Sequence, residues 1–176
     1  MVWLSNLLKS TAALLVLLVL VAYALPDRHL VERHHTIART PVQLWPLLAE
    51  PRQWSRWSPW HARDPKMLLG YSGPASGQGA QWSWDSETQG RGRMRFDEVQ
   101  PPNRLGYAVT FDNLGSTSRG EIRLEAVAAG TRVTWTLEST VGANVLLRWL
   151  SLAADYRLGR DVEEALDRLA EVAVQP

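Results

Sequence analysis

Tryptophan is the residue type in this chain with the clearest potential for ligand chemistry. The sequence holds nine Trp against two Phe. Trp54, Trp57 and Trp60 follow one another at three-residue intervals in a segment bounded by prolines, so a helical turn would place them on one side. Large flat rings make an efficient wall for an apolar ligand, and a buried indole N–H needs a hydrogen-bond partner. The spacing predicts a ligand-binding wall, with ordinary core packing as the alternative.

Three more aromatic residues fall on the apolar side of predicted strands. Trp82, Tyr107 and Trp135 each belong to a run in which apolar and polar residues alternate, and Trp84 shares the side of Trp82. We predict that Trp82, Tyr107 and Trp135 join the tryptophan cluster in binding a ligand. For Trp84 and Trp135, packing in the core is the favoured interpretation, and Trp135 is kept as a candidate binding residue.

The titratable groups offer only weak candidates for catalysis. His61 and Asp64 follow the tryptophan cluster and would form a general acid/base pair if they faced a cavity, with a surface loop as the alternative. Asp155 is a third candidate. The chain lacks both cysteine and a G-x-S-x-G motif, which excludes thiolate chemistry and leaves a hydrolase triad without its nucleophile motif.

A metal centre is not expected. Adjacent residues of a strand point to opposite faces, so His34 and His35 cannot bind one ion together. We therefore expect no metal and no cofactor, and we favour binding over enzyme activity.

The first 25 residues predict a transmembrane anchor. The run from Ser10 to Leu25 is uncharged, and counting from Val2 with Lys9 snorkelling gives a helix of about 36 Å, enough to cross a bilayer. The alternative is a cleaved signal peptide with Ala22-Tyr23-Ala24 at its cleavage site. We expect a single-pass membrane protein whose domain, residues 26–176, lies on the extracytoplasmic side, although the positive-inside rule points weakly the other way.

The domain reads as one antiparallel sheet with helices. Alternation predicts a first strand over His29–Ile37 and six more strands from Met67 onward, each apolar on one face. Between them, two short helices begin at Pro41 and Pro51. Apolar residues at helical spacing predict a helix of about 43 Å over residues 144–172, long enough to cover the sheet. Without Lys9 the remainder has no net charge, which disfavours nucleic acid as a partner.

Several local motifs, in this order along the chain, resemble one protein superfamily. They are Ile37-Ala38-Arg39-Thr40-Pro41-Val42-Gln43-Leu44-Trp45, Trp54-Ser55-Arg56-Trp57-Ser58-Pro59-Trp60, Tyr71-Ser72-Gly73-Pro74, Gly77-Gln78-Gly79-Ala80, Gly130-Thr131-Arg132-Val133-Thr134-Trp135 and Leu158-Gly159-Arg160-Asp161-Val162-Glu163. Together they resemble the START-like helix-grip superfamily, SRPBCC, and within it the membrane-anchored polyketide cyclase/dehydrase and lipid transport branch. The resemblance covers roughly residues 30 to 172. It departs at Thr40, where an Ala is more usual, and at Ala165, where a Gly is frequent.

The resemblance implies an α+β helix-grip fold, with a curved antiparallel sheet of about seven strands wrapped around a long C-terminal helix. It also implies a hydrophobic cavity between sheet and helix, which in this superfamily holds lipids, sterols or polyketides. We expect membrane-tethered binding of a hydrophobic small molecule or lipid. The alternatives are a cyclase or dehydratase that uses an acid/base residue at the cavity, and a protein-interaction module without a ligand.

Overall fold

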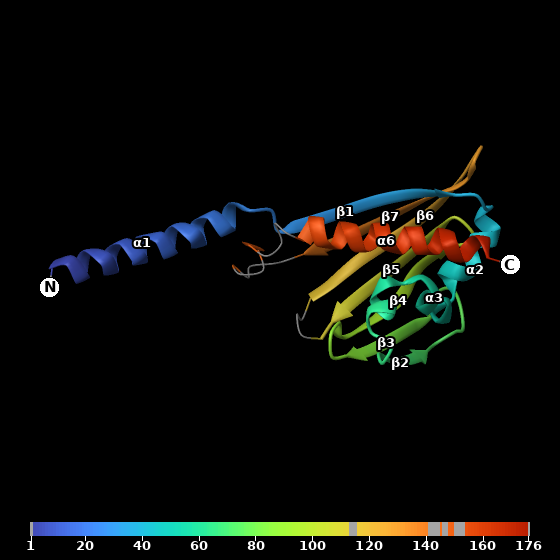
Figure 1. Ribbon diagram of the computed structural model, residues 1–176, viewed down its shortest axis with the longest axis horizontal. Helices are drawn as coiled ribbons and strands as arrows, with labels where there is room; N and C mark the ends of the chain where they lie inside the picture. The colour runs from blue at the N-terminus through green and yellow to red at the C-terminus, as the bar shows by residue number, and fades with distance from the viewer. Residues whose placement is uncertain (1, 113–115, 141–144, 146–147, 150–153, 176) are drawn as a thin grey trace.

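One antiparallel sheet of seven strands forms the body of the protein (Figure 1). The computed structural model describes residues 2–112, 116–140, 145, 148–149 and 154–175. The strands are β1 (Arg28–Ile37), β2 (Leu68–Ser72), β3 (Gln81–Ser86), β4 (Gly90–Gln100), β5 (Arg104–Phe111), β6 (Ser116–Val127) and β7 (Gly130–Thr140). Their order across the sheet is β1-β7-β6-β5-β4-β3-β2, so every strand from β2 to β7 pairs with its neighbour in sequence, and β1 closes the far edge beside β7. The expected seven-stranded antiparallel sheet is confirmed.

Alternation of side chains gives the sheet one buried face. On β5, Leu105, Tyr107 and Val109 are buried, and on β7 the same is true of Val133, Trp135 and Leu137. These residues are two apart, as the pleat of a strand requires. The buried face is therefore the one that the apolar halves of the sequence pattern predict.

The connection from β1 to β2 is helical. It consists of α2 (Pro41–Ala49), a 3₁₀ turn η1 (Pro51–Gln53), α3 (Trp54–Trp57) and α4 (Pro59–Arg63). Thr40 begins α2 with a capping box: its hydroxyl accepts from the backbone N–H of Gln43 at 3.4 Å, and its own N–H donates to the Gln43 side chain at 2.9 Å. The sequence predicts only two short helices here, ending at Ser58-Pro59. Pro59 instead starts a further helix, because proline is well tolerated in a first helical turn, where its missing N–H has no partner to lose.

The C-terminal helix α6 (Ala154–Val174) lies across the buried face of the sheet, along β1 (Figure 1). Val162, Leu166 and Leu169 are buried in the same core as the sheet residues, as their helical spacing predicts, and Ala165 is buried beside them. Gly159 lies against Arg33 of β1, and a Cβ atom at this position would overlap the guanidinium. The predicted helix starts earlier, at residue 144, but most of residues 144–153 lies outside the described part of the chain.

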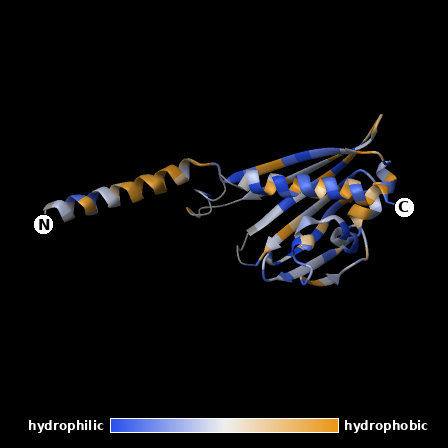
Figure 2. Ribbon diagram, in the orientation of Figure 1, coloured by the Kyte–Doolittle hydropathy of each residue, from blue (hydrophilic) through white to orange (hydrophobic). Residues whose placement is uncertain are grey.

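The expected transmembrane helix is the part of the fold prediction that is wrong. Helix α1 (Val2–Ala24) forms and projects away from the sheet, yet no helix among the described residues is long and apolar enough to cross a membrane (Figure 1). Polar residues, including Asn6, Lys9 and Thr11, interrupt the first half of this helix. The longest stretch without such an interruption is therefore Ala12–Ala24 (Figure 2). That stretch is roughly 20 Å long, against a hydrocarbon core of about 30 Å.

The end of α1 is held by the segment that precedes α6. The Arg148 guanidinium donates to the carbonyl oxygens of Ala22, Tyr23 and Leu25 at 3.1 to 3.3 Å. The Trp149 indole donates to the Leu18 carbonyl at 3.3 Å. A cation at this point adds a donor for the carbonyl groups at the end of the helix and complements the negative end of the helix dipole.

Candidate functional site

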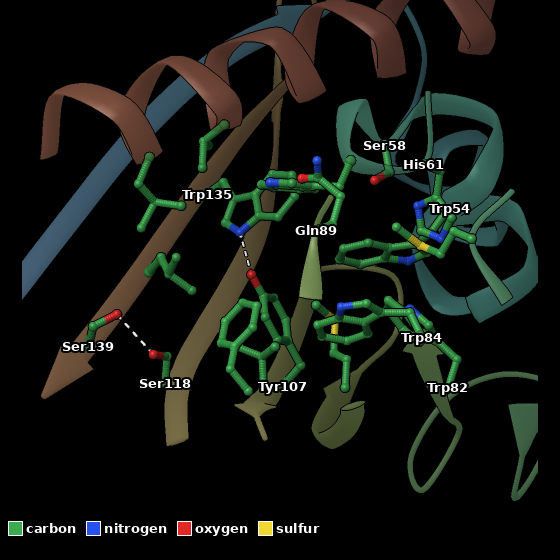
Figure 3. A pocket seen from close by; sticks show the side chains of 18 residues that line it. Trp54, Ser58, His61, Trp82, Trp84, Gln89, Tyr107, Ser118, Trp135 and Ser139 are labelled. Carbon is green, nitrogen blue, oxygen red and sulfur yellow. Dashed lines mark hydrogen bonds between the residues drawn. The ribbon is translucent and has the colours of Figure 1, made fainter. Parts of the chain in front are cut away.

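A cavity of about 260 Å³ lies between the buried face of the sheet, the α3–α4 segment and α6 (Figure 3). Seven aromatic residues line it, contributed by five elements: Trp54, Trp60, Trp82, Trp84, Tyr107, Phe111 and Trp135. The remaining lining residues are Ser58, His61, Met67, Gln89, Met94, Val109, Ser118, Leu137, Ser139, Leu158 and Val162. In volume the cavity is close to the lower end of typical small-molecule sites, about 300–1,000 Å³.

Trp54 is the centre of the aromatic wall. Its ring centroid lies 5.0 Å from that of Trp82 and 5.6 Å from that of Trp135, the second contact being edge-to-face. Its indole N–H donates to the Leu48 carbonyl at 2.8 Å, near the end of α2. Because the ring is packed on several sides and its polar atom is bonded, Trp54 forms a fixed surface.

Trp57 lies behind this wall. It is fully buried, its ring centroid is 4.5 Å from that of Trp54, and its indole N–H donates to the Leu47 carbonyl at 3.0 Å. It does not line the cavity. Of the three clustered tryptophans, the structure therefore places Trp54 and Trp60 at the cavity and Trp57 in the core.

Tyr107 and Trp135 form a hydrogen-bonded pair at the cavity wall. The Trp135 indole donates to the Tyr107 hydroxyl oxygen at 2.7 Å, across the intervening strand β6 (Figure 3). Residue 120 of β6 is a glycine, and a Cβ there would overlap the Tyr107 ring. Burial raises the pKa of Tyr107 well above its ordinary value, an effect only partly offset by the hydrogen bond from Trp135. The phenol is therefore neutral at physiological pH.

A second glycine makes room for Trp84. A Cβ at Gly92 would overlap both the Trp84 ring and the Thr110 carbonyl oxygen. Trp84 packs edge-to-face on Phe111, with centroids 5.6 Å apart, and both line the cavity. Core packing, the interpretation favoured for Trp84 from the sequence, therefore describes only part of its surroundings.

His61 is the cavity residue with an unmatched polar atom. It projects from α4 beside Ser58, at the helical end of the cavity (Figure 3). Its Nδ1 is buried and has no hydrogen-bond partner in the described part of the chain. Burial lowers the pKa of His61 below its ordinary value, so the neutral imidazole is favoured.

The other two candidates for acid/base chemistry are not at the cavity as described. Asp64 accepts a hydrogen bond from the Ser86 hydroxyl at 2.6 Å and one from the Lys66 backbone N–H at 3.0 Å. Asp64 does not line the cavity, so the structure does not join it to His61 as an acid/base pair. Asp155 falls in α6, but its side chain lies outside the described part of the chain.

Ion pairs fasten the α3–α4 segment to α6. Arg63, the last residue of α4, contacts the carboxylates of Asp161 and Glu164 at 2.6 and 2.7 Å. These contacts raise the pKa of Arg63 and lower that of Glu164. Since Trp60 and His61 lie in the same short helix, the ion pairs help to hold them over the cavity.

The structure brings together five of the six predicted ligand-binding residues. Trp54, Trp60, Trp82, Tyr107 and Trp135 line one cavity. A role in binding stays a prediction for all of them. Sequence reasoning missed Trp84, Phe111 and Gln89 as lining residues; the first two share strand faces with Trp82 and Tyr107, whereas no local pattern marks Gln89. Among the described residues no cluster of three or more His, Cys, Asp or Glu could hold a metal ion.

The comparison with known families identifies the class of protein. The sequence model described as "Polyketide cyclase / dehydrase and lipid transport" matches residues 28–174, and the chain belongs to this family. The resemblance to the polyketide cyclase/dehydrase and lipid transport family is thus confirmed, whereas the match does not test the membrane anchoring expected of its branch. No curated protein matches the chain.

Solved structures share the fold at low sequence identity. Truncated norcoclaurine synthase from Thalictrum flavum superposes with a TM-score of 0.63 at 10% identity, over 85% of this chain and 95% of that one. A protein from Chromobacterium violaceum gives 0.62 at 14% identity, over 84% and 98% of the two chains. One from Rhizobium leguminosarum gives 0.61 at 15% identity, over 84% and 95%. These similarities show a common fold.

Proposed function

We propose that this protein binds a small hydrophobic molecule in the cavity between its sheet and α6. The observation that carries the proposal is the cavity itself: seven aromatic rings surround it, and no charged side chain lines it in the described part of the chain. Apolar walls with a few neutral polar groups are typical of small-molecule sites. The family description, which names polyketide cyclases and lipid transport, points to the same class of ligand.

The size of the cavity narrows the ligand further. At about 260 Å³ it suits a molecule of two or three fused rings, or one short acyl chain, better than a phospholipid with two long chains. Rings such as Trp54 are already fixed by packing and hydrogen bonds, so little conformational entropy is lost when a ligand is bound. Preorganisation of this kind supports a binding function.

A cyclase or dehydratase reaction is the second candidate, and the unmatched Nδ1 of His61 is what favours it. Proton transfer needs groups whose pKa values lie near the working pH. Burial moves the pKa of Tyr107 far above that range, and Asp64 is engaged outside the cavity. Binding without turnover is therefore the better account, and a polyketide-like compound incubated with the protein should be recovered with its mass and its NMR spectrum unchanged, which excludes both loss of water and a cyclisation that conserves mass.

Two half-buried tryptophans offer a matched test of the binding site. Trp60 lines the cavity, whereas Trp45 packs against the core from α2 without lining it. We expect Trp60→Ala to weaken binding of an apolar bicyclic probe such as naphthalene about tenfold, and Trp45→Ala to leave the affinity unchanged. Calorimetric titration of both variants measures this. Equal loss of affinity in the two variants would contradict binding at Trp60. It would mean either that the binding site lies elsewhere or that both substitutions weaken binding by destabilising the fold.

A further inference from the structure

The cavity lining carries no formal charge in the part of the chain that the structure describes. The polar groups of the lining side chains are hydroxyls, the indole N–H groups of five tryptophans, the Gln89 amide and the neutral imidazole of His61. Arg63, in the same short helix as His61, is paired with Asp161 and Glu164 of α6 and does not line the cavity. A carboxylate or ammonium group placed inside would lose its water without gaining a counter-ion, which is strongly unfavourable.

Most of these polar groups already have partners. The hydroxyls of Ser118 and Ser139 bond to each other at 2.9 Å, and the Gln89 amide donates to the Thr88 hydroxyl at 3.2 Å. Tyr107 accepts from the Trp135 indole. His61 differs, because its Nδ1 is buried without a partner, and buried polar atoms almost always have one.

We infer that the molecule held in this cavity is uncharged and carries a hydroxyl group that hydrogen-bonds to Nδ1 of His61. The inference rests on the proposed function and narrows its ligand class to hydroxylated apolar molecules, as distinct from free fatty acids and other organic anions. The apolar part of such a molecule lies against the aromatic rings, and its hydroxyl lies at the end of the cavity where Ser58 and His61 project side by side (Figure 3).

A hydroxyl fits this position better than other neutral groups. A neutral imidazole has one nitrogen that donates and one that accepts. A hydroxyl can donate or accept, so it satisfies Nδ1 in either tautomer, whereas a carbonyl or ether satisfies only the protonated nitrogen. The lowered pKa of His61 agrees with this assignment, since it disfavours the imidazolium that would act as the counter-ion of an anionic ligand.

Three probes built on one ring system separate charge from hydrogen bonding. Naphthalene has no polar group, a naphthol adds a hydroxyl, and a naphthoate adds a carboxylate that is ionised near neutral pH. By calorimetric titration of the full chain we expect the naphthol to bind at least tenfold more tightly than the naphthoate, and severalfold more tightly than naphthalene. A naphthoate that binds as tightly as the naphthol would overturn the inference.

Two substitutions test whether His61 is the partner. His61→Phe fills similar space without a polar atom, and should lower the ratio of naphthol to naphthalene affinity from severalfold to about one, whatever it does to the affinity for naphthalene itself. His61→Asn keeps a short polar group and should retain part of that preference; it also serves if the phenylalanine variant does not fold. Naphthol preference that persists unchanged in both variants would contradict the assignment.

The outcomes also distinguish this inference from the proposed function. If the three probes bind equally well to the wild-type protein, the cavity binds apolar molecules but does not select among them, and only the inference fails. If none of the three binds, the proposed function fails for molecules of this size, and the inference fails with it.

Discussion

At the scale of single residues, a glycine on the neighbouring strand makes room for the ring of Tyr107. Gly120 faces Tyr107 across the β5–β6 pair, and the ring occupies the space that a Cβ would need. From there the phenol reaches over β6 to the Trp135 indole, and the two rings together form one wall of the cavity. The position of this wall therefore depends on one hydrogen bond between two buried residues and on the space left by a buried glycine.

Removing the Tyr107 hydroxyl tests the contribution of that hydrogen bond. Tyr107→Phe leaves the buried N–H of Trp135 without an acceptor, which should lower the free energy of unfolding by about 1–3 kcal/mol. Tyr71→Phe is a suitable control, because Tyr71 is half-buried and its ring is contacted by the Arg52 guanidinium, which the substitution leaves in place. Urea denaturation of both variants measures the difference. Equal effects would show that the Tyr107–Trp135 bond contributes nothing of its own.

His61 predicts how stability depends on pH. Its pKa is lowered in the folded state, so below about pH 6.5 the unfolded chain binds a proton that the native state resists. Stability should consequently fall as the pH drops through the interval between the unfolded and the folded pKa, and this contribution should be absent above that interval. Unfolding midpoints measured across this range should fall less steeply for His61→Phe than for the wild type. Parallel curves would show that His61 does not titrate differently on folding.

At the scale of elements, α6 closes the core against the sheet. Leu166 lies in the middle of its apolar stripe and is 1% exposed, among residues of the sheet and of α2 and α3. The same helix forms ion pairs with two other elements. Asp161 contacts Arg63 of α4, and Glu163 contacts Arg33 of β1, so α6 connects the α3–α4 segment to the edge strand of the sheet. Loss of packing along α6 should therefore destabilise the whole domain.

Leu166→Ala tests the packing of that stripe. It removes buried methyl groups and leaves a cavity, so the free energy of unfolding should fall by about 2–5 kcal/mol. Glu171→Ala, an exposed position of the same helix, should change it by less than about 0.5 kcal/mol. Chemical denaturation of the pair measures both values, and a Leu166→Ala effect as small as that of the control would contradict the described packing.

Gly159 and Arg33 provide a test of the contact between α6 and β1. Alanine at position 159 should favour the helix by about 1 kcal/mol, but its Cβ displaces the Arg33 guanidinium, which is 2.6 Å from Glu163. In the wild-type background we expect the two effects nearly to cancel. In an Arg33→Ala background the full gain of about 1 kcal/mol should appear. A double-mutant cycle measures the coupling, and an identical gain in both backgrounds would show that Arg33 does not restrict this glycine.

At the scale of the whole molecule, the features that repeat along the chain are the ones that the sequence predicts. Period-2 alternation gives the strands, and helical spacing gives Val162, Leu166 and Leu169 of α6. Features that depend on one local residue are harder to predict: Pro59 starts α4, and polar residues in the first half of α1 shorten its apolar stretch.

The candidate site is predictable only in part, because it depends on contacts between residues that are distant in the sequence. A strand pattern shows which way Trp82 or Tyr107 points, but not how far its ring extends. The fit of Tyr107 over Gly120 depends on the register between β5 and β6, which joins residues thirteen positions apart. Likewise, only the packing of α3 distinguishes Trp57, in the core, from Trp54, at the cavity.

The central claim, that an apolar molecule enters this cavity, is tested most directly by the indole N–H signals in the NMR spectrum of protein labelled at tryptophan. The nine indoles report from different places: Trp60, Trp82 and Trp84 line the cavity, whereas Trp3 and Trp45 lie away from it. On addition of a naphthol, we predict that the signals of the lining tryptophans shift with a common saturation curve and that those of Trp3 and Trp45 stay in place. Shifts confined to Trp3 and Trp45, or no saturable shift of any lining indole, would contradict the account.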